Sequence, residues 1–165
     1  MEARAKMMGH SLHQMLIAFP LGLLATAVVF DLAYVVWSGE GWATASFYMI
    51  AAGVSGGVAA AVFGLVDWLA LPQATRAYRV GLWHGLGNAL VLVLFAASWL
   101  LRRDAPTEPG AAAIVLSVAG GGLALATAWL GGELVDRLGV GVDDGAHLDA
   151  PSSLSGRPAA PEARP

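Results

Sequence analysis

Four long apolar stretches, separated by short polar segments, make up most of the 165-residue chain. They cover about residues 15–37, 42–71, 80–101 and 111–135. Each is long enough for an α-helix that crosses a bilayer, which needs about 20 apolar residues. The pattern predicts an all-α integral membrane four-helix bundle over residues 1–142. The remainder, 143–165, is acidic and then rich in Pro and Ala, which predicts a disordered tail.

Composition supports the membrane interpretation and removes several kinds of chemistry. Hydrophobic residues make up 57% of the chain and charged residues only 13%, about half the charge of a typical soluble domain. The chain has no cysteine, which excludes disulfides, thiolate catalysis and Cys-ligated clusters. It also lacks a phosphate-binding loop, a Ser-His-Asp order and a basic patch suited to nucleic acid. We therefore expect the lipid bilayer as its surroundings, no nucleic-acid partner and no soluble-type enzyme.

The distribution of basic residues predicts an orientation. Four spans place both termini on one side, and basic residues near the membrane number five on that side against two on the other. The first set is Arg4, Lys6, Arg76, Arg79 and Arg137, and the second is Arg102 and Arg103. The positive-inside rule then places both termini in the cytoplasm. Abundant Ala, Gly and Arg favour a bacterial source, and so a multi-pass protein of the cytoplasmic (inner) membrane.

Each predicted helix has one face of small and polar residues, the kind of face through which membrane helices pack. In chain order the four faces are His10, His13, Ile17, Pro20, Leu24, Ala27, Asp31, Tyr34; Gly53, Gly57, Ala60, Gly64, Asp67; Gly81, His84, Asn88, Val91, Phe95, Ser98; and Ala119, Gly122, Ala126, Trp129, Glu133, Asp136. Every face carries polar side chains at the end nearest the termini. A bundle is expected to gather these side chains into one layer.

The expected layer suits a cofactor, and two kinds remain open. A b-type haem takes axial histidines from different helices, which His10 or His13 could supply together with His84. A divalent metal such as zinc, iron or manganese could instead use a histidine–carboxylate set. That set is His13, Asp67, His84 and Glu133, with Asn88, Asp31 and Asp136 as supporting polar residues. Either site would allow electron transfer with a separate redox partner; catalytic residues are unknown.

Asp31 belongs to the opposite boundary of the membrane. It lies 18 residues after His13, or roughly 27 Å along a helix. Charges inside membrane proteins usually pair, so we expect an ion pair between Asp31 and Arg102 or Arg103, with Ser98 nearby.

Two other functions stay open beside the cofactor site. The polar layer could be an interhelical network in a structural or scaffold protein, and the glycine-rich second or fourth span could join copies of the chain into a homo-oligomer. Intramembrane acids and histidines also mark ion and proton pathways. The middle of the bundle is apolar, however, and the spans show no obvious inverted repeat, so transport is the weaker alternative.

Several motifs, in order, resemble a bacterial family of predicted membrane proteins, the domain-of-unknown-function 2231 family. They are Gly9-His10-x-x-His13-x-x-Leu16-x-x-Phe19-Pro20, Phe30-Asp31-Leu32, Gly64-Leu65-Val66-Asp67-Trp68-Leu69, Arg79-Val80-Gly81-Leu82-Trp83-His84-Gly85 and Trp129-Leu130-Gly131-Gly132-Glu133-Leu134. The resemblance covers about residues 9–142 and implies a four-span protein without established biochemistry. Fusions of some members to Rieske-type or cytochrome c-type domains suggest electron transfer. This chain has no such domain, so a redox role would need a cofactor in the bundle or a partner.

Overall fold

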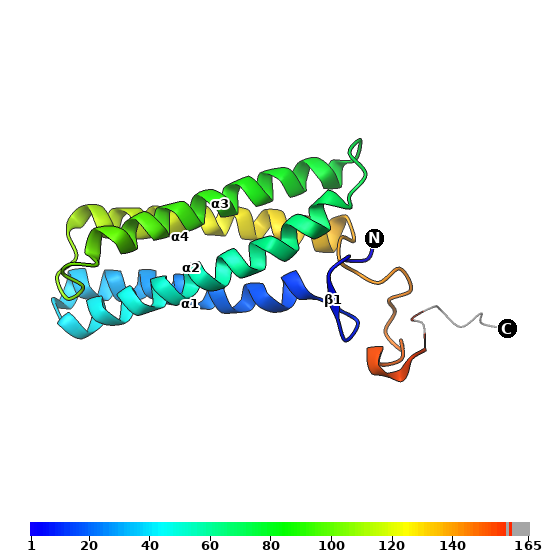
Figure 1. Ribbon diagram of the computed structural model, residues 1–165, viewed down its shortest axis with the longest axis horizontal. Helices are drawn as coiled ribbons and strands as arrows, with labels where there is room; N and C mark the ends of the chain where they lie inside the picture. The colour runs from blue at the N-terminus through cyan, green and yellow to red at the C-terminus, as the bar shows by residue number, and fades with distance from the viewer. Residues whose placement is uncertain (158, 160–165) are drawn as a thin grey trace.

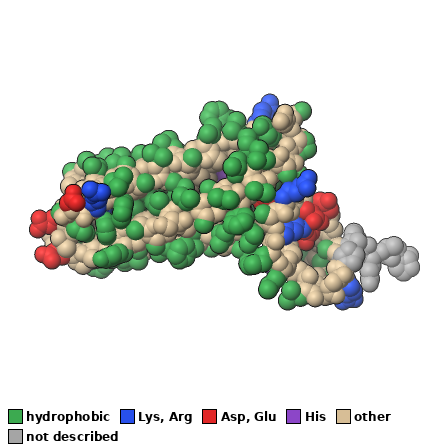
Figure 2. All heavy atoms as spheres, in the orientation of Figure 1, with side chains coloured by type: hydrophobic (Ala, Val, Ile, Leu, Met, Phe, Trp, Pro, Cys, Tyr) green, Lys and Arg blue, Asp and Glu red, His purple; other side chains and the backbone are tan. Residues whose placement is uncertain are grey.

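Four long helices form an elongated bundle in the computed structural model, which describes residues 1–157 and 159 (Figure 1). They are α1 (Leu12–Trp37), α2 (Glu40–Leu69), α3 (Arg76–Arg102) and α4 (Ala111–Gly132), and a five-residue π-helix, η1 (Glu133–Arg137), continues α4. All four are long and apolar enough to span a membrane. Hydrophobic side chains cover the length of the bundle and charged side chains gather at its two ends (Figure 2). The protein is an all-α, four-span membrane protein.

The four helices are arranged as two antiparallel hairpins. α1 packs most extensively on α2, and α3 on α4, while smaller contacts of α2 with α3 and of α1 with α4 join the hairpins. The starts of α1 and α3 and the ends of α2 and α4 therefore lie at one end of the bundle, together with the N-terminus (Figure 1). Ser11 and Thr75 cap α1 and α3 by accepting backbone N–H groups, which fixes where these two helices begin.

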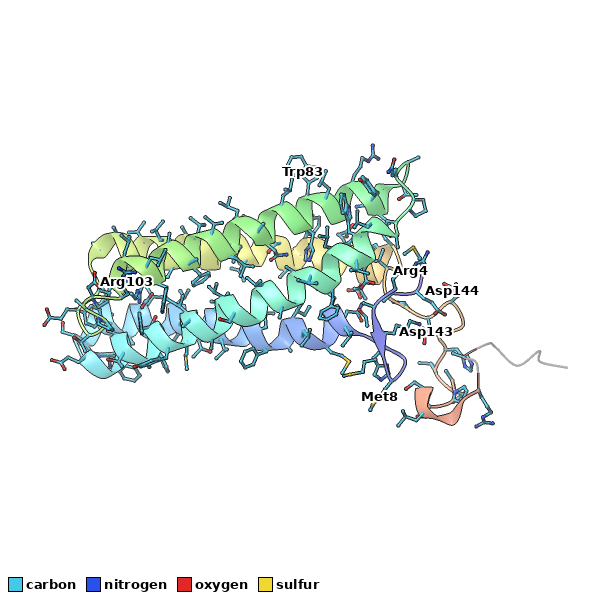
Figure 3. All side chains as sticks on the ribbon, viewed as in Figure 1. Arg4, Met8, Trp83, Arg103, Asp143 and Asp144 are labelled. Carbon is cyan, nitrogen blue, oxygen red and sulfur yellow. The ribbon has the colours of Figure 1, made fainter. Side chains whose placement is uncertain are left out.

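The N-terminal segment folds back over this end. β1 (Lys6–Met7) and β2 (His10–Ser11) form a small antiparallel ladder. The chain after η1 runs beside it in turns and reaches a short 3-10 helix, η2 (Ser153–Ser155). Arg4, Asp143 and Asp144 lie at this end of the molecule and Arg103 at the other (Figure 3). The last part of the predicted disordered tail, residues 158 and 160–165, lies outside the described residues.

The two hairpins repeat each other. Leu24 of α1 fills the space where Gly53 of α2 has no side chain, since a Cβ there would lie 2.7 Å from Leu24. Phe95 of α3 fills the same space beside Gly120 of α4, where a Cβ would lie 2.9 Å from its ring. The equivalent positions are 71 residues apart in α1 and α3 and 67 residues apart in α2 and α4. The bundle thus has a parallel internal repeat, with a pseudo-two-fold axis along its length.

The centre of the bundle is apolar. Its buried cluster consists of Leu24, Ala27, Ile50, Val91 and Phe95. Polar side chains collect above and below this cluster, so the interior has two separate polar sites, one at each end.

The predicted inward faces agree with the structure on α2 and α3 and on most of α1, where His10 and Ile17 are exposed instead, and the face predicted for α4 is wrong. Trp129 is 65% exposed, and Ala119, Gly122 and Ala126 also face outward. The buried face consists instead of Ala113, Ser117, Gly120 and Thr127. The prediction treated Trp129 as part of the interior, whereas a tryptophan near a span end commonly lies in the membrane interface.

Candidate functional site

His13 and His84 face each other across the two hairpins. His13 lies in the first turn of α1 and His84 in the third turn of α3. Their ring centroids are 6.4 Å apart and their planes are nearly perpendicular, at 89°. The two histidines occupy equivalent positions of the repeat, 71 residues apart. The structure therefore places one imidazole from each hairpin at the pseudo-two-fold axis.

Each imidazole is oriented by a backbone carbonyl of the other helix in its hairpin. Nδ1 of His13 is 2.9 Å from the carbonyl oxygen of Ala60, and Nδ1 of His84 is 2.9 Å from that of Thr127. A carbonyl only accepts hydrogen bonds, so Nδ1 carries the hydrogen in both rings. In the neutral form this leaves the Nε2 lone pair of each ring for a ligand.

Each imidazole also lies against a glycine one helical turn beyond its carbonyl partner. A Cβ at Gly64 would lie 2.9 Å from the His13 ring, and a Cβ at Gly131 would lie 3.1 Å from the His84 ring. Glycine at these two positions lets the rings pack directly against the backbones of α2 and α4. These contacts repeat between the hairpins like the histidines themselves.

Asn88 and Thr127 add polar contacts on the His84 side. The Thr127 hydroxyl donates to Asn88 Oδ1 at 3.0 Å, and Asn88 Nδ2 donates to the His84 carbonyl oxygen at 2.9 Å. Asn88 Nδ2 also lies 3.4 Å from Nδ1 and 3.2 Å from Nε2 of His84. A donor in the ring plane at Nε2 would lie much further from Nδ1. The amide therefore sits over the ring face, a weak N–H···π contact, and does not occupy the Nε2 lone pair.

The structure does not bring the predicted carboxylates into one group with the histidines. Asp67, at the end of α2, accepts the backbone N–H groups of Arg4 at 2.7 Å and Ala5 at 3.1 Å. Glu133 pairs with Arg76 at 2.6 Å. Both carboxylates thus hold other parts of the terminal end in place.

The remaining predicted site residues lie apart as well. His10 belongs to β2 and is exposed, and Asp136 of η1 is also exposed. Within residues 1–157 and 159, no cluster of three or more His, Cys, Asp or Glu side chains could hold a metal ion. Of the predicted residues, His13, His84 and Asn88 come together and Asp67, Glu133, His10 and Asp136 do not.

The far end contains a buried ion pair, as expected from the sequence. Arg102 donates to both carboxylate oxygens of Asp31, at 2.8 Å and 3.1 Å, and neither side chain is accessible to solvent. The Ser117 hydroxyl also donates to Asp31. Arg102 further donates to Ser46 Oγ at 3.3 Å and Ser98 Oγ at 2.8 Å. Both charges are thus paired and hydrogen-bonded, which a buried pair requires.

Thr127, Gly131 and the Ala60 carbonyl were not predicted as parts of the site. Thr127 shares a buried stripe of α4 with Ser117 and Gly120, and the half-buried Gly131 continues that stripe at helical spacing. That stripe is the signal that could have identified them. A backbone acceptor such as the Ala60 carbonyl cannot be identified from the sequence, because every residue has a backbone carbonyl.

The chain matches a known protein family but no individual protein. The family described as "Predicted membrane protein (DUF2231)" matches residues 9–144. Neither a curated protein nor a solved structure matches the chain.

Proposed function

The chain belongs to this family of predicted membrane proteins, and we propose that His13 and His84 bind one b-type haem between the two hairpins, for electron transfer. The site lies near the end of the bundle that carries the termini. Following the basic-residue distribution, we place that end at the cytoplasmic face of a bacterial inner membrane, where a separate redox partner could reach it.

The spacing of the two imidazoles is the observation that carries the proposal. If both imidazoles held one metal ion at metal–nitrogen distances of about 2 Å, their ring centres would lie roughly 6 Å apart. The centroids of His13 and His84 are 6.4 Å apart.

The number of ligands favours haem over a bare divalent metal. A structural zinc site takes four protein ligands and a catalytic one takes three. Within the described residues the two histidines have no third His, Cys, Asp or Glu partner. A haem would need fewer ligands from the protein, and His13 and His84 are the residues that would hold it.

The internal repeat supports a requirement for two identical ligands. At the far end, Asp31 of the first hairpin and Arg102 of the second occupy equivalent positions. Their side chains differ and carry opposite charges, which form an ion pair. A difference in residue type between the two hairpins is compatible with a purely structural contact. At the near end both hairpins carry histidine with the same carbonyl and glycine contacts. Two imidazoles held in the same way would suit a ligand that needs two equivalent histidines.

The surrounding residues have separate roles in this proposal. The carbonyls of Ala60 and Thr127 fix the tautomer and orientation of the two rings, and such bonds make an imidazole a more basic ligand. Haem, when bound, supplies one-electron chemistry. The apolar cluster around Leu24 and Phe95 separates the site from the opposite face of the membrane. That cluster contains no polar residue, which argues against a role in transport.

A structural role for the polar layer is the second candidate. Its support is that His84, Asn88 and Thr127 hydrogen-bond to one another without any ligand. Such a network would stabilise the bundle and bind nothing.

Haemin titration of the detergent-purified protein separates the two candidates. The chain has four histidines, so His13→Ala/His84→Ala has a matched control in His10→Ala/His147→Ala, which removes the two exposed ones. The proposal predicts a Soret band that saturates at one haemin per chain in the wild type and in the control, and is absent in His13→Ala/His84→Ala. A wild type without saturable haemin binding, and with the histidine pair contributing only thermal stability, would support the structural candidate.

A further inference from the structure

We propose that Met7, His10 and Met15 form a binding site for Cu(I) at the end of the bundle that carries the N-terminus. The three residues belong to the ladder of β1 and β2 and to the first turn of α1. The site contains neither His13 nor His84, so it is independent of the proposed function of that pair.

The methionines of the chain are concentrated in this region. Four of the five, Met1, Met7, Met8 and Met15, lie within the first 15 residues, and the fifth, Met49, lies in α2. Met7, Met8 and Met15 are 45%, 72% and 46% exposed, although methionine is among the residues most often buried. Their thioether sulfurs are soft ligands, which select Cu(I) over harder cations.

The N-terminal ladder places Met7 next to His10. The two residues are directly opposite each other in β1 and β2, so their side chains lie on one face with Cβ atoms about 4.5–5.5 Å apart. The turn between them consists of Met8 and Gly9, both with positive φ, 51° and 85°. Such a turn normally takes Asn-Gly or Asp-Gly, so Met8 is strained at this exposed end of the molecule (Figure 3). Strained residues cluster at binding sites, and this turn holds Met7 and His10 together.

Met15 shares an open cavity with His10. Both residues line this cavity, which has a volume of about 280 Å³ and also borders Asp143. The Asp143 carboxylate accepts a hydrogen bond from Lys6 at 2.7 Å, so it is already paired and is a poor ligand for a divalent cation. Methionine has three rotatable side-chain bonds, which allow the sulfurs of Met7 and Met15 to turn toward an ion on the His10 ring.

The His10 ring is available as a ligand. Among residues 1–157 and 159 it makes no hydrogen bond and is exposed, whereas the rings of His13, His84 and His147 each take part in at least one. Zinc is bound by thiolate, imidazole and carboxylate. Imidazole combined with thioether suits Cu(I) better, and we expect Cu(I) and its analogue Ag(I) to bind here in preference to zinc.

Titration of the detergent-purified protein with Ag(I), followed by carbon-13 NMR of the methionine methyl groups, identifies the ligands. The chain has no cysteine, so methionine is the only source of sulfur ligands. The signals of Met7 and Met15, assigned from single leucine variants, should shift together and saturate at one Ag(I) per chain, while that of Met49 stays in place. A saturable shift that leaves out Met7 or Met15 would overturn this ligand set. The absence of any saturable shift would overturn the site.

Competition with a Cu(I) chelator under anaerobic conditions measures the affinity. His10→Ala and Met7→Leu/Met15→Leu should each weaken Cu(I) binding by at least about tenfold, because losing even an indirect support of a metal costs that much. Leucine has nearly the volume of methionine, so the fold is retained. The matched control is Met49→Leu/His147→Ala, which should bind like the wild type. An affinity of His10→Ala equal to that of the control would contradict the proposal, as would displacement of Cu(I) by an equal concentration of Zn²⁺.

The variant His13→Ala/His84→Ala separates this site from the proposed haem site. It should bind Cu(I) with the affinity of the wild type, whether or not the wild type takes up haemin. Loss of Cu(I) binding in this variant, with unchanged helix content, would place the ion at the histidine pair and overturn the site at Met7, His10 and Met15.

Discussion

Asp31 and Arg102 form a buried ion pair at positions that repeat the spacing of the histidines: each lies 18 residues after the histidine of its own hairpin. The pseudo-two-fold axis thus passes through two contacts, His13–His84 at one end and Asp31–Arg102 at the other. The apolar cluster lies between them. The His13–His84 contact is symmetric and leaves the Nε2 atoms of both rings available. The Asp31–Arg102 contact is asymmetric and fully hydrogen-bonded.

Breaking the far contact should strongly destabilise the bundle. Arg102→Ala leaves Asp31 buried without its partner, and removing one member of a buried pair typically costs about 3–5 kcal/mol. Arg103→Ala is the control, because the ion pair of Arg103 with Asp104 is exposed and is of a kind worth about 0–1 kcal/mol. Unfolding in mixed detergent measures both. A loss for Arg102→Ala as small as that for Arg103→Ala would contradict the structural role of the pair.

The glycines beside the imidazoles should not tolerate a methyl group. Gly64→Ala places a Cβ 2.9 Å from the His13 ring, so the ring must move, and overpacking of this kind typically costs about 1–3 kcal/mol. We expect weaker haemin binding and lower stability. Gly122→Ala on α4 is the control, since nothing lies within 4 Å of its Cβ position. Unchanged haemin affinity in Gly64→Ala would show that the ring position is not required.

Asp67 should hold the N-terminal segment and not the cofactor. Asp67→Ala removes the acceptor for the N–H groups of Arg4 and Ala5; hydrogen bonds to a charged group are worth about 1.5–3 kcal/mol. The chain has no cysteine, so a spin label on Met8→Cys reports this segment without background. The label should become more mobile, with helix content and haemin affinity unchanged. Asp136→Ala, at an exposed carboxylate, should leave the label as it is.

The same segment should also loosen at high pH. Lys6 bonds to Asp143 at 2.7 Å and to Glu2 at 2.6 Å, and these hydrogen bonds, that with Asp143 first, raise the pKa of Lys6 above its ordinary value of 10.5. Because the pKa is raised in the folded state, the stabilisation is complete below pH 10.5 and is lost as the pH rises through the shifted pKa. The label on Met8→Cys should gain mobility in that range. Lys6→Met should make it mobile at pH 8, with no further step at high pH.

The number of helices, the end that carries the polar layer and the Asp31–Arg102 pair were all predictable from the sequence. They follow from the length of the apolar stretches and from the cost of an unpaired charge in a membrane. Which face of α4 points into the bundle was not predictable in the same way. Its buried polar residues, Ser117 and Thr127, each also bond to a carbonyl of their own helix. A hydroxyl satisfied in this way can face either the lipid or the interior.

Which groups the carboxylates of Asp67 and Glu133 contact depends on short-range geometry, and the spacing of residues along the sequence does not reveal that geometry. Asp67 and Glu133 do lie at the predicted end, but the folded-back N-terminal segment and Arg76 offer them nearer partners. The repeat is only partly visible in the sequence, where His13 and His84, Gly53 and Gly120, and Gly64 and Gly131 are identical at equivalent positions. The equivalent pairs Leu24 and Phe95, or Asp31 and Arg102, match in position and contact but not in residue type.

The central proposal is that His13 and His84 would hold one haem, and an absorbance spectrum of the protein purified from membranes, without added haemin, tests it most directly. We expect a Soret band and a reduced spectrum of a six-coordinate b-type haem, at one haem per chain. The band should be lost in His13→Ala/His84→Ala and kept in His10→Ala/His147→Ala. A colourless wild-type protein that also fails to take up haemin would contradict the claim and leave the histidine pair as a structural contact between the hairpins.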